Sequence, residues 1–208
     1  MRATKARLAN EIARSISKEV LANLPIQRYE GEVRMVATAQ DVEHALADIR
    51  CETVVGLDTE TRPAFSKGES YLPCLVQVAT ARAVYLFQLS GVNVFPLVTE
   101  LLQAPISKAG VALAHDLRSL KVVFPFEEKN VIDLGLVARG CGLSQTGLRN
   151  LAGIFLGIRI PKGNRTSNWA ARHLSQAQIT YAATDAWVCR ELFLRFETLG
   201  LLDSTISY

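Results

Sequence analysis

Two acidic residues near the middle of the chain have the types and spacing of a site for hard divalent cations. Asp58 and Glu60 form a D-x-E pair directly after the apolar run 53–57. Because residues i and i+2 of an extended chain point to the same side, we expect both carboxylates to project together. Such a pair repels itself unless a proton or a cation lies between its members, and oxygen ligands suit Mg²⁺ or Mn²⁺. An isolated D-x-E also occurs often by chance, as a cap beside a surface charge.

Two further stretches add acidic residues at positions where chemistry is possible. Asp116 follows an apolar segment and opens a predicted helix, where an aspartate is also a favoured N-cap. Near the C-terminus, Tyr181 and Asp185 are four residues apart in a predicted helix and fall inside or at the edge of its apolar arc. An aspartate directed toward the core must be hydrogen-bonded, paired or bound to metal. A buried Tyr–Asp hydrogen bond is the structural alternative.

Short apolar segments predict the sheet that must position these side chains. They are the runs 53–57, 75–79, 83–87, 107–114 and 130–132, and helical patterns fit 39–50, 94–103 and 116–123. The short connection 80–82 predicts a hairpin, whereas helices join the later strands. Ser175 and Gln178 form a capping-box pattern that begins the last helix, and Gly200 lies just past its end. The expected fold class is α/β, with a mixed five-stranded sheet flanked by helices.

The first 34 residues have a pattern of their own. Leu8, Ile12, Ile16, Val20 and Leu24 recur every four residues, which predicts one helix ending at Pro25, followed by a short linker at 29–34. This stretch holds seven basic and four acidic residues, and the difference of three equals the net charge of the whole chain, +3. We favour a solvated helix face over a nucleic-acid-binding arm. We therefore divide the chain into an N-terminal helical extension, 1–34, and a main domain, 35–208.

Composition places the protein among ordinary globular chains. It has 208 residues, of which 49% are apolar and 21% charged, enough for one buried core. No apolar run reaches the roughly 18 residues of a membrane span, so no membrane association is expected. Its four cysteines are scattered without a C-x-x-C pair, which disfavours a zinc site or a disulfide framework. Reduced thiols in a cytoplasmic protein fit best.

Taken together, the motifs resemble the DEDD superfamily of 3′→5′ exonucleases, in its tyrosine-containing subfamily of ribonuclease D and Werner-type enzymes. The resemblance runs from about Val36 to Phe196 and is strongest in V-V-G-L-D-T-E-T, residues 54–61, and in the stretch 148–186. It implies a ribonuclease H-like fold. It also implies a metal-dependent exonuclease that acts on single-stranded or 3′-terminal DNA or RNA and releases nucleoside 5′-monophosphates.

The resemblance also assigns roles to the acidic residues. Asp58 would bridge two divalent ions, Glu60 and Asp185 would hold the first, and Asp116 would hold the second. Tyr181 would orient the attacking water. The histidine subfamily carries its corresponding residue five positions before the last aspartate, where this chain has Thr180. The alternative to Asp116 is Asp133, which matches a usually structural aspartate of the family.

Substrate contacts are predicted around two of these motifs. Lys162 and Arg165 precede Trp169 in a polar loop and could contact phosphates. Trp169 would stack on a base or, as is more common beside a helix start, serve as a packing anchor. By resemblance, a terminal nucleotide would be wedged by residues flanking the first motif, namely Leu57, Thr59 and Thr61.

The sequence disfavours two other functions. A catalytically inactive nucleic-acid-binding module on the same fold is disfavoured because all four carboxylates and the tyrosine are present. A nucleotide-binding or small-molecule α/β enzyme is disfavoured because neither G-x-x-x-x-G-K-[ST] nor G-x-G-x-x-G follows any predicted strand.

Overall fold

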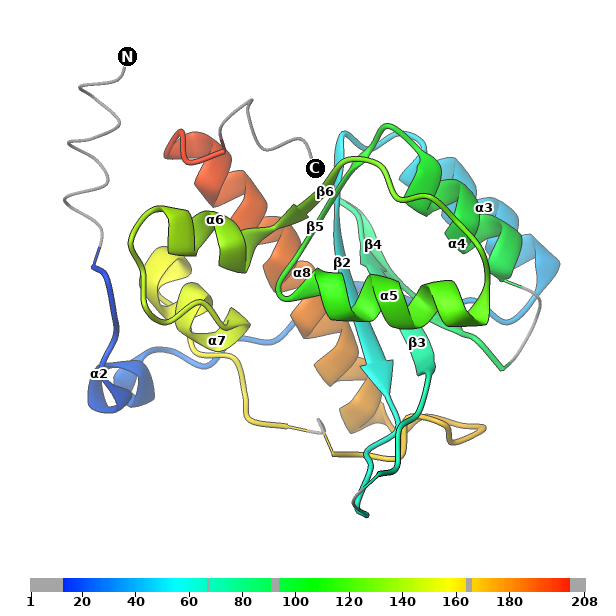
Figure 1. Ribbon diagram of the computed structural model, residues 1–208, viewed down its shortest axis with the longest axis horizontal. Coiled ribbons are helices and arrows are strands. Elements are labelled where there is room, and N and C mark those ends of the chain that lie inside the picture. Colours follow the sequence, from blue (N-terminus) through cyan, green and yellow to red (C-terminus); the bar gives the residue numbers. More distant parts are fainter. Residues whose placement is uncertain (1–12, 67, 91–93, 164–165, 203–208) are drawn as a thin grey trace.

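A computed structural model describes residues 13–66, 68–90, 94–163 and 166–202, and shows a six-stranded mixed sheet with helices on both faces (Figure 1). The strand order is β1-β4-β3-β2-β5-β6. Strands β2, β3 and β4 are antiparallel neighbours, whereas β1 pairs with β4, and β5 with β2 and β6, in parallel. The strands are β1 (Glu32–Met35), β2 (Val54–Thr61), β3 (Pro73–Ala79), β4 (Ala83–Gln88), β5 (Ser107–Gly110) and β6 (Val131–Asp133).

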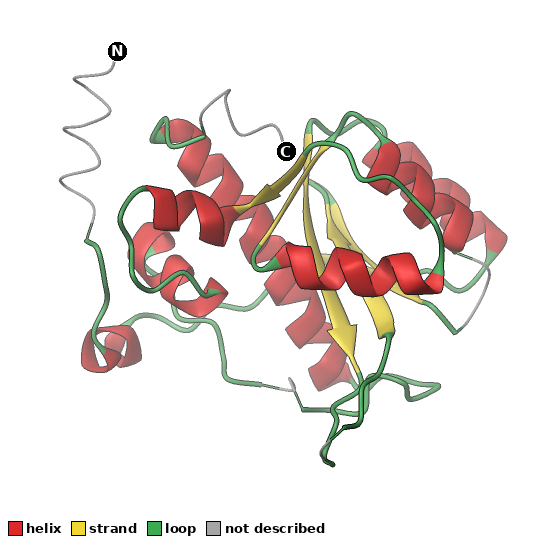
Figure 2. Cartoon of the chain, in the orientation of Figure 1, coloured by secondary structure: helices red, strands yellow, loops and turns green. Residues whose placement is uncertain are grey.

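Helices cover both faces of this sheet (Figures 1 and 2). One face packs against the long helix α8 (Gln176–Thr198), and the other against α3 (Ala39–Ile49), α4 (Phe95–Gln103) and α5 (Leu113–Val123). The remaining helical segments are α2 (Lys18–Asn23), α6 (Leu134–Gly140), α7 (Leu148–Leu151) and the π-helical turn η1 (Ala152–Leu156). Among the described residues, no helix combines the length and apolar character that crossing a bilayer requires.

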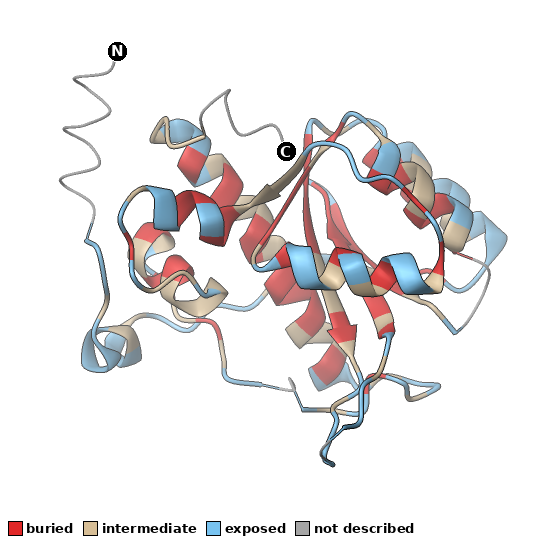
Figure 3. Cartoon of the chain, viewed as in Figure 1, coloured by how far each residue is buried: buried red, intermediate tan, exposed pale blue. Residues whose placement is uncertain are grey.

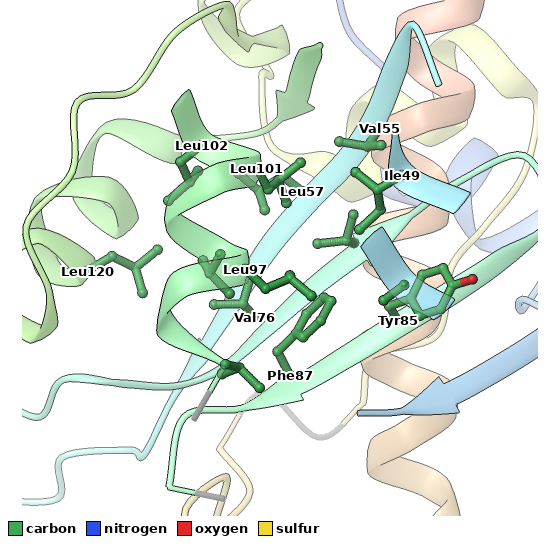
Figure 4. Close-up of a cluster of buried hydrophobic side chains, with 14 of the residues drawn as sticks. Ile49, Val55, Leu57, Val76, Tyr85, Phe87, Leu97, Leu101, Leu102 and Leu120 are labelled. Carbon is green, nitrogen blue, oxygen red and sulfur yellow. The ribbon is translucent and has the colours of Figure 1, made fainter. Parts of the chain in front are cut away.

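The central strands are mostly buried (Figure 3), and their side chains alternate between two buried layers. Leu57 and Val76 face α4 and α5 in the cluster drawn in Figure 4, while Leu75 and Leu86 face α8. Burying one such side chain contributes about 1.5–3 kcal/mol. Because both faces of β2 are covered, its first half is continuously apolar, as the sequence indicated.

Strand β2 and helix α8 touch through their backbones at Gly56. A Cβ atom on Gly56 would lie 2.0 Å from the carbonyl oxygen of Ala186. Any larger residue would therefore push the helix away from the strand. This contact brings the second half of β2 next to the residues that precede Ala186 on α8.

The predicted α/β class with a mixed sheet and flanking helices is confirmed, but the count of five strands is wrong. Residues 32–34, predicted as the end of a linker, form β1 together with Met35 and pair in register with β4. The sequence does not mark this strand because it lies at the sheet edge and is only four residues long, with Val33 and Met35 facing α8 and the charged Glu32 and Arg34 alternating with them. The proposed division at residue 34 falls within this strand and stays a prediction.

Two boundaries also differ from the sequence-based expectation. The strand predicted at 107–114 ends at Gly110, and α5 begins at Leu113 rather than at 116. The helix predicted from Leu8 to Leu24 is helical only over Lys18–Asn23, with Ser17 as its N-cap, and residues 1–12 lie outside the described part of the chain.

Candidate active site

Three of the predicted carboxylates converge beside the β2–α8 contact. One carboxylate oxygen each from Asp58, Glu60 and Asp185 lie within 4.8 Å of one another. Asp58 and Glu60 lie within β2 rather than after it, opposite Gln77 and Leu75 of β3, and their i, i+2 spacing places them on one face as expected. Asp185 reaches them from α8, which begins with the predicted capping box of Ser175 and Gln178.

Asp116 approaches the same place from the other side of β2. Strand β5 pairs with β2 only as far as Gly56 and Ala109, so the half of β2 that carries Asp58 has no neighbour on that edge. The chain then turns through Ala112, in the left-handed region at φ 62°, and enters α5, whose first turn carries Asp116. Asp116 is close enough for its charge to act on Asp58, although it is not one of the three residues within 4.8 Å.

Asp133 is engaged by the backbone instead. Its carboxylate accepts hydrogen bonds from the backbone N–H groups of Leu113 at 3.1 Å, Gly135 at 2.9 Å and Leu136 at 3.1 Å. It therefore caps α6 and fixes the first residue of α5. This supports the structural role considered for Asp133 and, through α5, the placement of Asp116.

The three aspartates of this site hold their protons more strongly than free ones. Burial, and then the negative charges of Asp185 and Asp116, raise the pKa of Asp58 well above its usual range. Burial raises the pKa of Asp185 to about 6, and burial likewise raises the pKa of Asp116 to about 6. Negative charges crowded in a poorly solvated space favour a proton or a cation between them. The ligand atoms are all oxygen, which fits Mg²⁺ or Mn²⁺.

Tyr181 lies one helical turn before Asp185 and is held from two sides. Its ring contacts that of Trp169, with centroids 5.9 Å apart, and a Cβ atom on Gly163 would lie 2.6 Å from its Cδ2. Burial, and then the charges of Asp185 and Glu60, raise the pKa of Tyr181, so its hydroxyl stays protonated. The hydroxyl donates its hydrogen to the carboxylate of Asp185, and its oxygen can accept a hydrogen bond at the edge of the carboxylate cluster.

The structure corrects two of the predicted substrate contacts. Trp169 is fully buried against α8, so the base-stacking alternative is wrong and the packing alternative holds. Leu57 is also fully buried, in the core on the α4 and α5 side, so its side chain cannot wedge a nucleotide. Both side chains serve the hydrophobic core, because the alternation of β2 turns Leu57 inward and the loop before α8 lays Trp169 against that helix.

Three of the other predicted substrate contacts, Thr59, Thr61 and Lys162, lie near the site. Thr59 and Thr61 are half-buried on β2, and the Thr59 hydroxyl is close enough to Asp116 to oppose the rise in that residue's pKa. Lys162 is exposed and lines a pocket of about 380 Å³ beside Tyr181 and Asp185. Arg165 lies outside the described residues.

Sequence reasoning missed several neighbours of the cluster. The positive charge of Arg149, on α7, acts on Asp185 and opposes the rise in its pKa. Gln77 is fully buried opposite Asp58, and no described residue hydrogen-bonds its amide. Arg28 lines the same pocket as Lys162. No local pattern marks these residues, because each comes near the site only through the packing of distant elements.

Comparison with known proteins agrees with this geometry. Residues 33–200 match the family model of the 3′-5′ exonuclease. The chain belongs to the 3′-5′ exonuclease family. Ribonuclease D of Gluconacetobacter diazotrophicus is 32% identical over 83% of this chain and 45% of its own length. The bifunctional 3′-5′ exonuclease/ATP-dependent helicase WRN of Mus musculus is 30% identical over 93% of this chain and 15% of its own length.

The solved structure of a relative has the same fold as this chain. The crystal structure of Escherichia coli RNase D, an exoribonuclease involved in structured RNA processing, superposes with a TM-score of 0.70 and 25% identity. The match covers 82% of this chain and 47% of that one. The ribonuclease H-like fold implied by the sequence is thereby confirmed. The chain spans less than half the length of each of these three relatives.

Proposed function

We propose that this protein hydrolyses phosphodiester bonds of DNA or RNA from the 3′ end and releases nucleoside 5′-monophosphates. The observation that carries the proposal is the convergence of Asp58, Glu60 and Asp185 within 4.8 Å in a chain of the 3′-5′ exonuclease family. The similarity to ribonuclease D and to the 3′-5′ exonuclease/helicase WRN supports it. All four acidic residues and the tyrosine are present in the sequence, which disfavours an inactive binding module.

The carboxylates are suited to hold two divalent cations, Mg²⁺ or Mn²⁺. We assign Asp58 to both ions, Glu60 and Asp185 to the first, and Asp116 to the second. Such a pair lowers the pKa of an attacking water and stabilises the charge of the leaving 3′-oxygen. The position of Asp116, across β2 from Asp185, supports its assignment to a separate ion.

The side chains of the protein supply the remaining steps. Tyr181, protonated and held next to Gly163 and Trp169, would accept a hydrogen bond from the attacking water and so orient it. Lys162, in the pocket beside Tyr181, supplies a positive charge to a substrate phosphate. Thr59 and Thr61 lie on the strand that flanks the terminal nucleotide. A cytoplasmic location is also proposed, and it rests on four free cysteines.

The test is digestion of 5′-labelled single-stranded DNA and RNA oligonucleotides, side by side, with Mn²⁺ or with a chelator. Product ladders that shorten from the 3′ end, only with metal and not with Asp58→Ala, are the expected result. Glu19→Ala, an exposed acidic residue on α2, controls for the loss of a negative charge. Equal activity of Asp58→Ala and the wild type would refute the assignment.

A further inference from the structure

The segment 25–29, here called the N-terminal strap, is fixed along one wall of the active site. The backbone N–H of Gln27 donates to the carbonyl of Arg159 at 3.0 Å, and the N–H of Arg159 donates to the carbonyl of Pro25 at 2.9 Å. The N–H of Tyr29 donates to the Thr184 hydroxyl at 3.0 Å. Thr184 immediately precedes Asp185 on α8, so the strap is tied at one end to the helix that carries the site.

The backbone of Arg28 is held in place because it lies between these hydrogen-bonded residues. It lines the pocket of about 380 Å³ that Lys162, Tyr181 and Asp185 also line. Ile26 and Arg159 form a parallel bridge, so the two chain segments advance together toward this pocket. Arg28 follows Ile26 by two residues in one segment, and Lys162 follows Arg159 by three residues in the other.

The two cations of this pocket, Arg28 and Lys162, favour an anionic ligand. Within the described part of the chain, neither Arg28 nor Lys162 forms an ion pair. Both side chains are exposed, so each cation is free to bind a ligand that enters. A polyanion next to Asp185 is repelled by that carboxylate, and cations across the pocket offset this repulsion. The pocket is within the size range of small-ligand sites.

We propose that Arg28 binds a backbone phosphate of the substrate next to the scissile one, which makes the N-terminal strap part of the substrate site. The proposal rests on the exonuclease function above. The scissile phosphate must face the carboxylates, so a cation that lines the same pocket without belonging to the carboxylate cluster is left to meet a neighbouring phosphate. The planar guanidinium suits two-pronged contact with phosphate oxygens, and Lys162 adds a point charge.

The experiment measures binding and turnover separately. Dissociation constants for a labelled single-stranded oligonucleotide are measured across a salt series in an Asp58→Asn background, and steady-state kinetics in the otherwise wild-type protein. Arg28→Ala should weaken binding about tenfold and reduce the slope of log K against log salt by about 0.7. KM should rise while kcat changes little, since the contact is made before and during the reaction alike.

Arg195→Ala is the matched control. Arg195 is an exposed arginine in the last turn of α8, fourteen residues beyond Tyr181 and therefore about 21 Å along the helix. The variant Arg195→Ala removes the same charge at a position that does not line the pocket. Its KM should stay within about twofold of the wild type. Arg28→Lys should recover part of the lost affinity, because it restores the charge without the fork.

Three results would separate the possibilities. Equal losses in Arg28→Ala and Arg195→Ala would overturn the proposal in favour of general electrostatic attraction. A fall in kcat at unchanged KM would overturn it by placing Arg28 on the reacting phosphate. Wild-type protein that releases no nucleotide refutes the exonuclease function itself. Arg28→Gln, which keeps the stem and its polar tip, must reproduce the loss if Arg28→Ala lowers the melting temperature.

Discussion

Replacing Gly56 by alanine should disable the site without touching any acidic residue. The added Cβ atom would lie 2.0 Å from the carbonyl oxygen of Ala186 and 2.8 Å from the backbone nitrogen of Arg190. Both contacts are to the backbone of α8, so no side-chain rotation relieves them. Strand and helix must separate, and Asp185, which is bonded to Ala186, must move with the helix.

The size of the effect follows from these distances. Restoring 3.0 Å, below which Cβ contacts are essentially never seen, requires the carbonyl of Ala186 to recede by about 1 Å. Two oxygens on one Mg²⁺ lie at most about 4 Å apart, and the three ligand atoms already span up to 4.8 Å. A displacement of about 1 Å costs on the order of 100-fold in rate. Overpacking costs about 1–3 kcal/mol of stability.

The assay is Mn²⁺-dependent release of 3′-terminal nucleotides, with urea denaturation of the same samples. Gly147→Ala is the control, because a Cβ atom there meets nothing within 4 Å and its φ of −75° suits any residue. We expect Gly147→Ala to retain activity within about twofold of the wild type. The rate of nucleotide release by Gly56→Ala should fall roughly 100-fold even at full saturation with metal. A folded Gly56→Ala protein with wild-type turnover would refute the claim that the β2–α8 contact sets the carboxylate geometry.

Three other buried side chains give predictions of stability. Asp185→Asn should raise the free energy of unfolding of the metal-free protein by at most about 3 kcal/mol above pH 6. The reason is that the pKa of Asp185 is raised from 3.8 to about 6, so its ionisation destabilises the fold. Melting curves in chelator should show that this stabilisation vanishes below about pH 4. Trp169→Ala should cost about 3–5 kcal/mol in urea denaturation, whereas Trp169→Phe should leave the substrate Kd unchanged. Gln77→Met should add about 1–3 kcal/mol by removing an unpartnered buried amide; a loss in urea denaturation would show that the amide has a partner.

Local sequence patterns predicted much of this protein. The alternation of side chains in an extended chain placed Asp58 and Glu60 together, and the capping box marked the start of α8 at Ser175. The apolar arc of that helix turned Asp185 inward, where it is 7% exposed. Patterns of this kind are visible in sequence because they depend on the period of a single element.

Tertiary structure decided the features that depend on distances between elements. Strand β1 is short and at the sheet edge, so only its pairing with β4 reveals it. Trp169 and Leu57 looked available to a substrate, but the layers packed over them remove both from solvent. Residue type alone does not separate a side chain in the core from one in a pocket, because burial is set by what folds over it.

The sequence by itself predicted which residues would carry the chemistry, since Asp58, Glu60, Tyr181 and Asp185 occupy positions that local periodicity marks. Only the fold decided how closely they meet. Gly56 lets α8 rest on β2, and β5 ends at Gly110 so that Asp116 can approach the exposed edge. The strap brings Arg28 to the pocket from the far end of the chain. These are contacts between residues more than 50 positions apart, and they follow from packing rather than from any local pattern.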